Sequence, residues 1–98
     1  MERIVLSEAT EFQLKDGTVL KVYPLSGEKI IEIFPQVEEL EKLQASKDIR
    51  KVITLCMTLV YEIVKEDNPT ITTALLLKNL PISGGVKIIN IAMGVAGV

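Results

Sequence analysis

Few residues of this chain have the types and spacing that catalysis needs. The sequence contains no histidine and a single cysteine, Cys56, so it offers no serine or cysteine nucleophile with an imidazole base beside it. The serines all stand where turns or helix caps explain them, and they are Ser7, Ser26, Ser46 and Ser83. We therefore expect no catalytic residues and no enzyme activity.

Three short patterns resemble ligand sites, and each has a simpler interpretation. Glu38, Glu39 and Glu41 are neighbouring acids on a predicted helix, which is usually a solvated face. Asp67-Asn68 is not followed by the spaced oxygen ligands of a metal loop. Ser83-Gly84-Gly85 lacks the lysine and hydroxyl that a phosphate-binding loop needs in fixed register. We expect no metal and no cofactor.

The single cysteine and the net charge exclude further classes of protein. One cysteine allows neither an intramolecular disulfide nor a zinc-thiolate cluster, and Cys56 fits best as a small buried side chain. The net charge is −2 and the pI is near 5.1, so the basic footprint of a nucleic-acid binder is missing. We see no signal peptide, and the longest uncharged stretch, residues 88–98, is shorter than the about 20 residues that cross a bilayer. These features favour a cytoplasmic protein that contacts no membrane.

The composition predicts one domain, residues 1–98, with more aliphatic side chains than a small core needs. Hydrophobic residues make up 48% of the chain and aromatic residues only 4%, with a mean hydropathy of +0.35. A short chain has much surface for its volume, and apolar surface that is not buried usually becomes an interface. We expect self-association or a protein partner.

The first quarter of the chain predicts a β-hairpin over residues 11–23. Asp16-Gly17 favours a tight turn, and apolar residues alternate with polar ones on both sides of it. Pro24 cannot donate a ladder hydrogen bond, so the second strand ends there. The inner face is then Phe12, Leu14, Leu20 and Val22. Residues 3–6 remain open between a short third strand and an ordered arm.

Helical patterns fill the rest, from about residue 26 to residue 94. Ser26 is a suitable cap for a first helix, whose apolar stripe is Ile30, Ile31, Ile33, Phe34, Val37, Leu40 and Leu43. Pro35 interrupts this stripe, and we favour a break there over a single kinked helix because a proline inside a helix removes a hydrogen bond. The pattern after it predicts a central helix over about 48–66.

The last third of the chain carries a short helix and an apolar tail. Thr70 or Thr72 can cap the short helix, which ends before Pro81. Ser83-Gly84-Gly85 then leads into a segment with apolar residues on nearly every side. The fold class is therefore α+β, with an N-terminal hairpin packed on a bundle of three to four helices.

The apolar tail allows three interpretations. It is the last core helix, which is the usual place for apolar residues; it docks on a second copy or a partner; or it is an apolar strand. If it is an interface, the partner-binding residues are Val86, Ile89, Met93 and Val95.

A family resemblance lies mainly in residues 12–31 of a stretch that spans residues 12–33. The stretch FQLKDGTVLKVYPLSGEKIIEI is similar to the opening of small tail assembly chaperones of long-tailed bacteriophages and prophages. The residues that carry the resemblance are Phe12, Leu14, Asp16, Gly17, Val22, Pro24, Leu25, Ser26 and Gly27. It implies a non-enzymatic protein that coats the hydrophobic, helical tape measure protein in the host cytoplasm, usually as an oligomer.

Two other classes of function stay open. One is a structural virion or tail component that forms a ring when the hairpin edge pairs with a neighbouring subunit. The other is a small regulatory module that binds a protein. Neither uses catalytic residues, a cofactor or nucleic acid.

Overall fold

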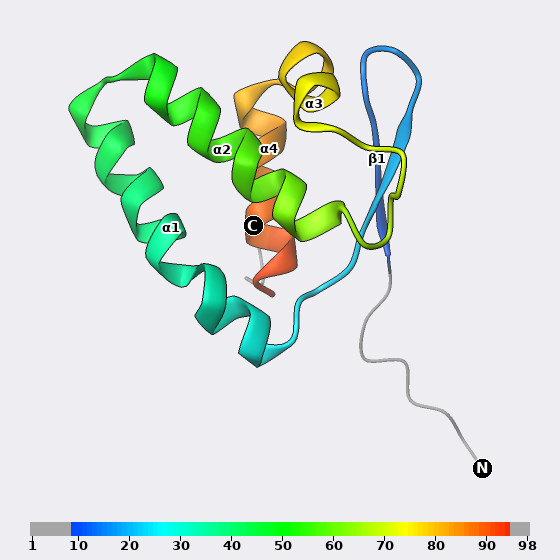
Figure 1. Ribbon diagram of the computed structural model, residues 1–98, viewed down its shortest axis with the longest axis horizontal. Helices are drawn as coiled ribbons and strands as arrows, with labels where there is room; N and C mark the ends of the chain where they lie inside the picture. Colours follow the sequence, from blue (N-terminus) through cyan, green and yellow to red (C-terminus); the bar gives the residue numbers. More distant parts are fainter. Residues whose placement is uncertain (1–8, 95–98) are drawn as a thin grey trace.

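The computed structural model describes residues 9–94, and its fold is α+β, as the sequence predicts. The elements are β1 (Thr10–Gln13), β2 (Val19–Val22), α1 (Gly27–Ser46), α2 (Ile49–Val64), α3 (Thr73–Asn79) and α4 (Ile82–Ala92). The β-hairpin lies on one side of the molecule and α1 on the other, with α2 crossing between them (Figure 1). Residues 3–6 and Val95, for which a strand and a partner contact were considered, lie outside the described residues.

The hairpin forms around the predicted turn. β1 and β2 are antiparallel with Phe12 opposite Leu20. Asp16 Oδ1 accepts a hydrogen bond from the backbone N–H of Thr18 at 3.0 Å, and Gly17 has a φ of 93°, which glycine adopts without strain. This hydrogen bond holds the pKa of Asp16 below its usual value. The buried residues of the inner face are Leu14, Leu20 and Val22, with Phe12 partly buried beside them.

One side chain fastens the hairpin to the helices. Asn68, just after α2, accepts a hydrogen bond from the Lys21 N–H at 3.0 Å and donates to the Lys21 carbonyl at 2.9 Å. The same amide donates to the carbonyl of Val64 at 2.9 Å. Asn68 therefore takes the place that a neighbouring strand would have on the outer edge of β2.

The first helix is continuous, so the predicted break at Pro35 is wrong. α1 begins after Ser26, whose hydroxyl accepts from the Lys29 N–H at 3.2 Å, and it runs through Pro35 to Ser46. The proline leaves the carbonyl of Ile31 without its helical donor. Both residues are exposed, so water can hydrate that carbonyl and the helix continues.

The central helix is α2, as predicted. Its first turn is capped by Asp48, which accepts from the Lys51 N–H at 3.3 Å. Seven of its sixteen residues are buried, and they are Val52, Cys56, Met57, Leu59, Val60, Ile63 and Val64. It contacts α1, α3, α4 and β2, which makes it the common partner of the other elements.

The glycines that we expected to lead into the last helix are part of it. α3 is capped by Thr72, and α4 begins at Ile82, so Gly84 and Gly85 lie in its first turns. A β-carbon on Gly85 would stand 2.6 Å from the Sγ of Cys56. Glycine is therefore needed because α4 crosses close to α2 here. Within residues 9–94, no helix has the length and hydropathy to span a membrane.

Candidate protein-binding surface

The predicted partner-binding residues lie on a helix of the core. Ile89 is only 3% exposed and belongs to the buried cluster, whereas Val86 and Met93 are partly buried at its margin. The backbone N–H of Leu25 donates to the Ala92 carbonyl at 2.7 Å, which ties the end of α4 to the start of α1. The tail is thus a core helix and not a strand, and partner binding through Val86 and Met93 stays a prediction.

The described residues provide little for catalysis or metal binding. Between residues 9 and 94, no group of three or more histidine, cysteine or acidic side chains is placed to hold a metal ion. Cys56 is fully buried, and this burial raises the pKa of its thiol to about 11. A thiol in that state is a poor nucleophile at neutral pH.

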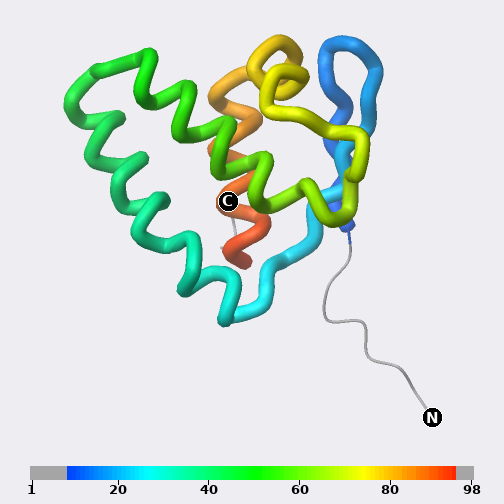
Figure 2. The backbone as a smooth tube through the Cα atoms, viewed as in Figure 1, coloured from blue at the N-terminus to red at the C-terminus, as the bar shows by residue number. Residues whose placement is uncertain are grey.

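The longest helix, α1, has a single packing partner within residues 9–94, as the short α3 also has. Of the elements in the described part of the chain, α1 packs against α2 alone. Figure 2 shows α1 on the side away from the strands, while α2 runs from the end of α1 across to the hairpin. Only Ile33 and Leu40 are buried among its twenty residues. Val37 and Leu43 are partly buried against the same cluster. Most of the predicted apolar stripe therefore lies at or near the surface.

The side of α1 that faces away from α2 carries apolar residues that are neighbours on the helix surface. Ile31 is 76% exposed and Phe34 is 44% exposed. Pro35 beside them is also exposed and stands at the margin of a hollow shared with α2. Residues three and four positions apart share one face of a helix. We call Ile31, Phe34 and Pro35 the outer face of α1.

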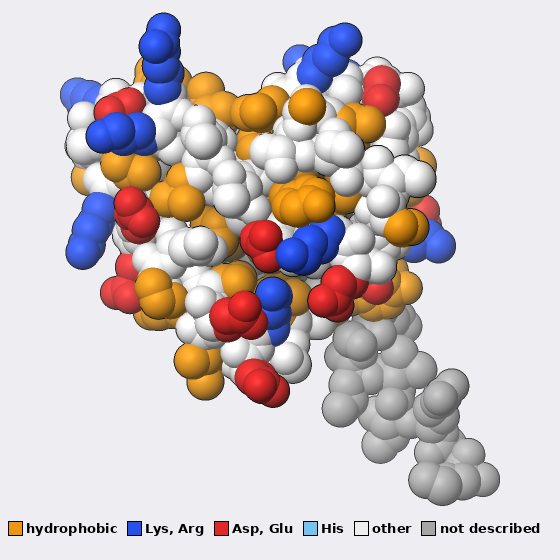
Figure 3. All heavy atoms as spheres, in the orientation of Figure 1, with side chains coloured by type: hydrophobic (Ala, Val, Ile, Leu, Met, Phe, Trp, Pro, Cys, Tyr) orange, Lys and Arg blue, Asp and Glu red, His pale blue; other side chains and the backbone are white. Residues whose placement is uncertain are grey.

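Carboxylates border the outer face. Glu28 precedes Ile31 by one turn, while Glu38 and Glu39 follow Pro35 by one turn, and all three are exposed. Figure 3 shows apolar and acidic side chains along the left of the molecule, where α1 runs, with lysine or arginine side chains among them toward the upper left. The outer face is therefore an apolar patch with an acidic rim.

Two lysines of α1 lie near this rim. Lys29 Nζ lies 3.6 Å from the Glu32 carboxylate, and its side chain is on the side of α1 that turns toward α2. Lys42 lies one turn beyond Glu38 and Glu39 on the same side of the helix. Because α1 carries five glutamates and these two lysines, its charge balance is negative.

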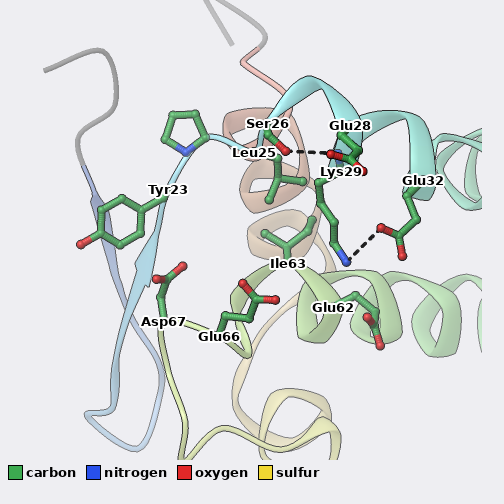
Figure 4. A pocket seen from close by; sticks show the side chains of 11 residues that line it. Tyr23, Leu25, Ser26, Glu28, Lys29, Glu32, Glu62, Ile63, Glu66 and Asp67 are labelled. Atoms are coloured by element: carbon green, nitrogen blue, oxygen red, sulfur yellow. Dashed lines mark hydrogen bonds and ion pairs between the residues drawn. The ribbon is translucent and has the colours of Figure 1, made fainter. Parts of the chain in front are cut away.

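A cavity of about 390 Å³ continues this acidic surface where β2 leads into α1. Figure 4 shows carboxylates from α1, from α2 and from the turn after α2 around it. They belong to Glu28, Glu32, Glu62, Glu66 and Asp67, with Lys29 as the one basic lining residue. Glu62 accepts a hydrogen bond from Lys65 at 2.9 Å, which raises the pKa of that lysine.

A second hollow, of about 340 Å³, lies further along α1 and α2 and is mainly apolar. Leu43 and Leu55 provide its apolar lining, and Glu39, Arg50 and Lys51 stand among its polar residues. It carries both signs of charge, unlike the acidic surface at the start of α1.

Sequence reasoning missed the outer face because it took the apolar residues of α1 as one helical stripe. The signal was present in two adjacent pairs, Ile30-Ile31 and Ile33-Phe34. Neighbouring residues on a helix point about 100° apart, so a single packing partner cannot cover both members of a pair. Ile33 is buried and Phe34 is exposed for this reason.

Comparison with models of protein families, with curated proteins and with solved structures gives no match.

Proposed function

We propose that this protein is a tail assembly chaperone of a long-tailed phage or prophage, a non-enzymatic factor that binds helical segments of the tape measure protein. The resemblance in residues 12–31 supports the family. The observation that carries the binding role is the outer face of α1, where Ile31 and Phe34 are exposed on a helix with one packing partner. Exposed apolar patches commonly mark protein interaction sites.

The mechanism follows from the chemistry of that face. An amphipathic client helix lays its apolar stripe along Ile31 and Phe34, which removes apolar surface of both proteins from water. Aliphatic and aromatic contacts of this kind tolerate many client sequences. Several copies on one long client, associated with one another in the host cytoplasm, gain avidity that one copy lacks.

The test is co-expression with a candidate tape measure protein. We expect a soluble complex by size-exclusion chromatography with light scattering. The double variant I31S/F34S should lose the complex while its thermal unfolding stays like that of the wild type. Leu77→Ser on α3 is the matched control, since Leu77 is 48% exposed but lies away from α1. A wild-type chain that leaves the client insoluble contradicts the proposal.

The second candidate is a ring-forming tail component, and the hairpin favours it to a limited extent. Asn68 occupies the outer edge of β2 at Lys21, whereas β1 has no second neighbouring strand among residues 9–94. β1 is thus the edge that an added strand would use. A stable closed ring that forms without any client, and ignores one when it is added, favours this candidate.

A further inference from the structure

We propose that the outer face of α1 is specific for basic amphipathic helices, in which lysine or arginine side chains border the apolar stripe. This inference rests on the proposed function and identifies the class of client segment. It depends on the combination of exposed apolar residues and an excess of carboxylates over lysines on a single helix.

The apolar part of the argument is that folding leaves Ile31 and Phe34 uncovered. α1 uses Ile33 and Leu40 to pack on α2, and no other element of the described chain contacts it. Ile31 and Phe34 lie three residues apart, as do the anchor residues that helical partners use. The structure therefore offers two adjacent apolar contacts for one partner helix.

The charged part of the argument selects the partner. Glu28, Glu38 and Glu39 stand within one turn of the apolar residues. Of the two lysines of α1, Lys29 pairs with Glu32 at 3.6 Å, and Lys42 lies one turn beyond Glu38 and Glu39. The helix carries five glutamates and these two lysines, so acidic residues remain in excess. The acidic cavity at the start of α1 extends the same sign of charge toward Glu66. A partner with basic residues beside its apolar stripe meets opposite charge along this whole path.

The same charges disfavour other occupants. If two copies joined through their outer faces, Glu28, Glu38 and Glu39 of each would come close to those of the other, and such like-charge contacts are costly. An anionic lipid surface and a nucleic acid carry the sign that this rim repels. A basic helix is the occupant that fits both the apolar centre and the rim.

The dimensions also suit a helix. α1 has twenty residues and is therefore about 30 Å long at about 1.5 Å per residue. The stretch from Glu28 to Glu39 occupies about three turns of it. A client helix of four to five turns, or about 16 residues, is long enough to cover this stretch.

The experiment uses two matched helical peptides with the same apolar residues, one bordered by lysine and the other by glutamate. Affinity for the whole chain is measured by fluorescence anisotropy at low and at high salt. We expect the lysine peptide to bind at least about tenfold more tightly at low salt, and we expect this advantage to shrink at high salt because salt screens exposed charges. Equal affinity of the two peptides overturns the proposal.

Variants of the chain then locate the site. Phe34→Ser should weaken binding of the lysine peptide about tenfold or more, and Leu77→Ser should leave it unchanged. The double variant E38Q/E39Q should keep binding of both peptides but reduce the preference for lysine. If Phe34→Ser has no effect, or if the preference survives E38Q/E39Q intact, this face is not the specific site.

These outcomes separate the inference from the proposed function. Equal binding of both peptides through Phe34 removes the charge preference and leaves a general helix-binding role in place. Preference for the lysine peptide in a chain that fails to solubilise the tape measure protein removes the chaperone role and leaves the specificity of the face in place.

Discussion

The two helices at the ends of the helical body, α1 and α4, are both rich in apolar residues and are buried to very different degrees. α4 buries four of its eleven residues, Gly85, Ile88, Ile89 and Ala92, whereas α1 buries two of twenty. α4 contacts both α2 and β2, and α1 contacts α2 alone within the described chain. How much of a helix is buried here depends more on the number of its packing partners than on its apolar content.

This difference divides the molecule into two kinds of surface. Substitutions along the buried side of α4 remove contacts with the central helix and the hairpin. Substitutions on the outer face of α1 remove contacts with nothing in the described chain, so they should affect a partner and leave the fold intact. The predictions below test this division.

The largest contrast should be between the rates at which a buried thiol and an exposed thiol react with a labelling reagent. Cys56, with a pKa raised to about 11 by burial, should react with a thiol reagent at neutral pH at least about a thousandfold more slowly than in denaturant, because labelling requires opening of the core. A cysteine at position 31, placed by I31C in a C56A background, should react within about tenfold of the denatured rate. Similar labelling rates for Cys56 and for the cysteine introduced at position 31, both measured in the folded protein, would remove the distinction between the buried core and the outer face of α1.

A matched pair of truncations should give the next largest contrast. Ile88 is fully buried in α4 and Ile31 is 76% exposed in α1. We expect Ile88→Ala to lower the free energy of unfolding by about 2–5 kcal/mol, and Ile31→Ala to change it by no more than about 0.5 kcal/mol. Urea denaturation followed by circular dichroism measures both. A loss of several kcal/mol in Ile31→Ala would mean that the outer face already has a partner within the chain.

The crossing of α4 over α2 should tolerate no added methyl group. Gly85→Ala places a β-carbon 2.6 Å from Cys56 Sγ, and we expect a loss of about 1–3 kcal/mol in unfolding free energy. Adding Cys56→Ala should recover much of this loss, because it removes the sulfur that the methyl group meets.

Gly84→Ala is the control for this experiment. Its β-carbon would meet the flexible end of Leu80 at 3.0 Å, and alanine favours the helix over glycine, so we expect a change close to zero. A double variant G85A/C56A that is no more stable than G85A would show that contact with the Cys56 sulfur does not cause the loss of stability.

The smallest effect should come from the proline in α1. Pro35→Ala restores a donor for the Ile31 carbonyl, which stabilises the folded helix. The greater freedom of the unfolded chain offsets part of this gain, so we expect a net stabilisation of about 1 kcal/mol. Amide hydrogen exchange should slow in α1 and remain unchanged in α4. The exposed Gln36→Ala is the control and should have no effect beyond about 0.5 kcal/mol. Equal slowing in both helices would indicate that they unfold as one unit.

Local signals predicted much of this fold. Asp16-Gly17 indicated the hairpin turn, Ser26 indicated where α1 begins, and Thr72 was one of two candidate caps for α3. Each of these signals acts within a few residues of the chain, so the sequence alone displays both partners of the interaction.

What sequence reasoning missed depends on residues far apart in the chain. The continuity of α1 through Pro35 depends on solvent around the Ile31 carbonyl, and the place of Gly85 inside a helix depends on Cys56 in another helix. The outer face of α1 depends on how many neighbours that helix has. Periodicity gives the side of a helix that is apolar but not the number of elements that cover it.

The amide of Asn68, which joins the hairpin to α2, also has a consequence for the chemical lifetime of the protein. Asparagine deamidates when the backbone nitrogen of the next residue attacks the side-chain carbonyl, and the next residue here is Pro69, whose nitrogen carries no hydrogen. Deamidation would place a carboxylate opposite the carbonyls of Lys21 and Val64, which now accept from the amide. Pro69 thus protects Asn68, and with it the attachment of the hairpin, against deamidation.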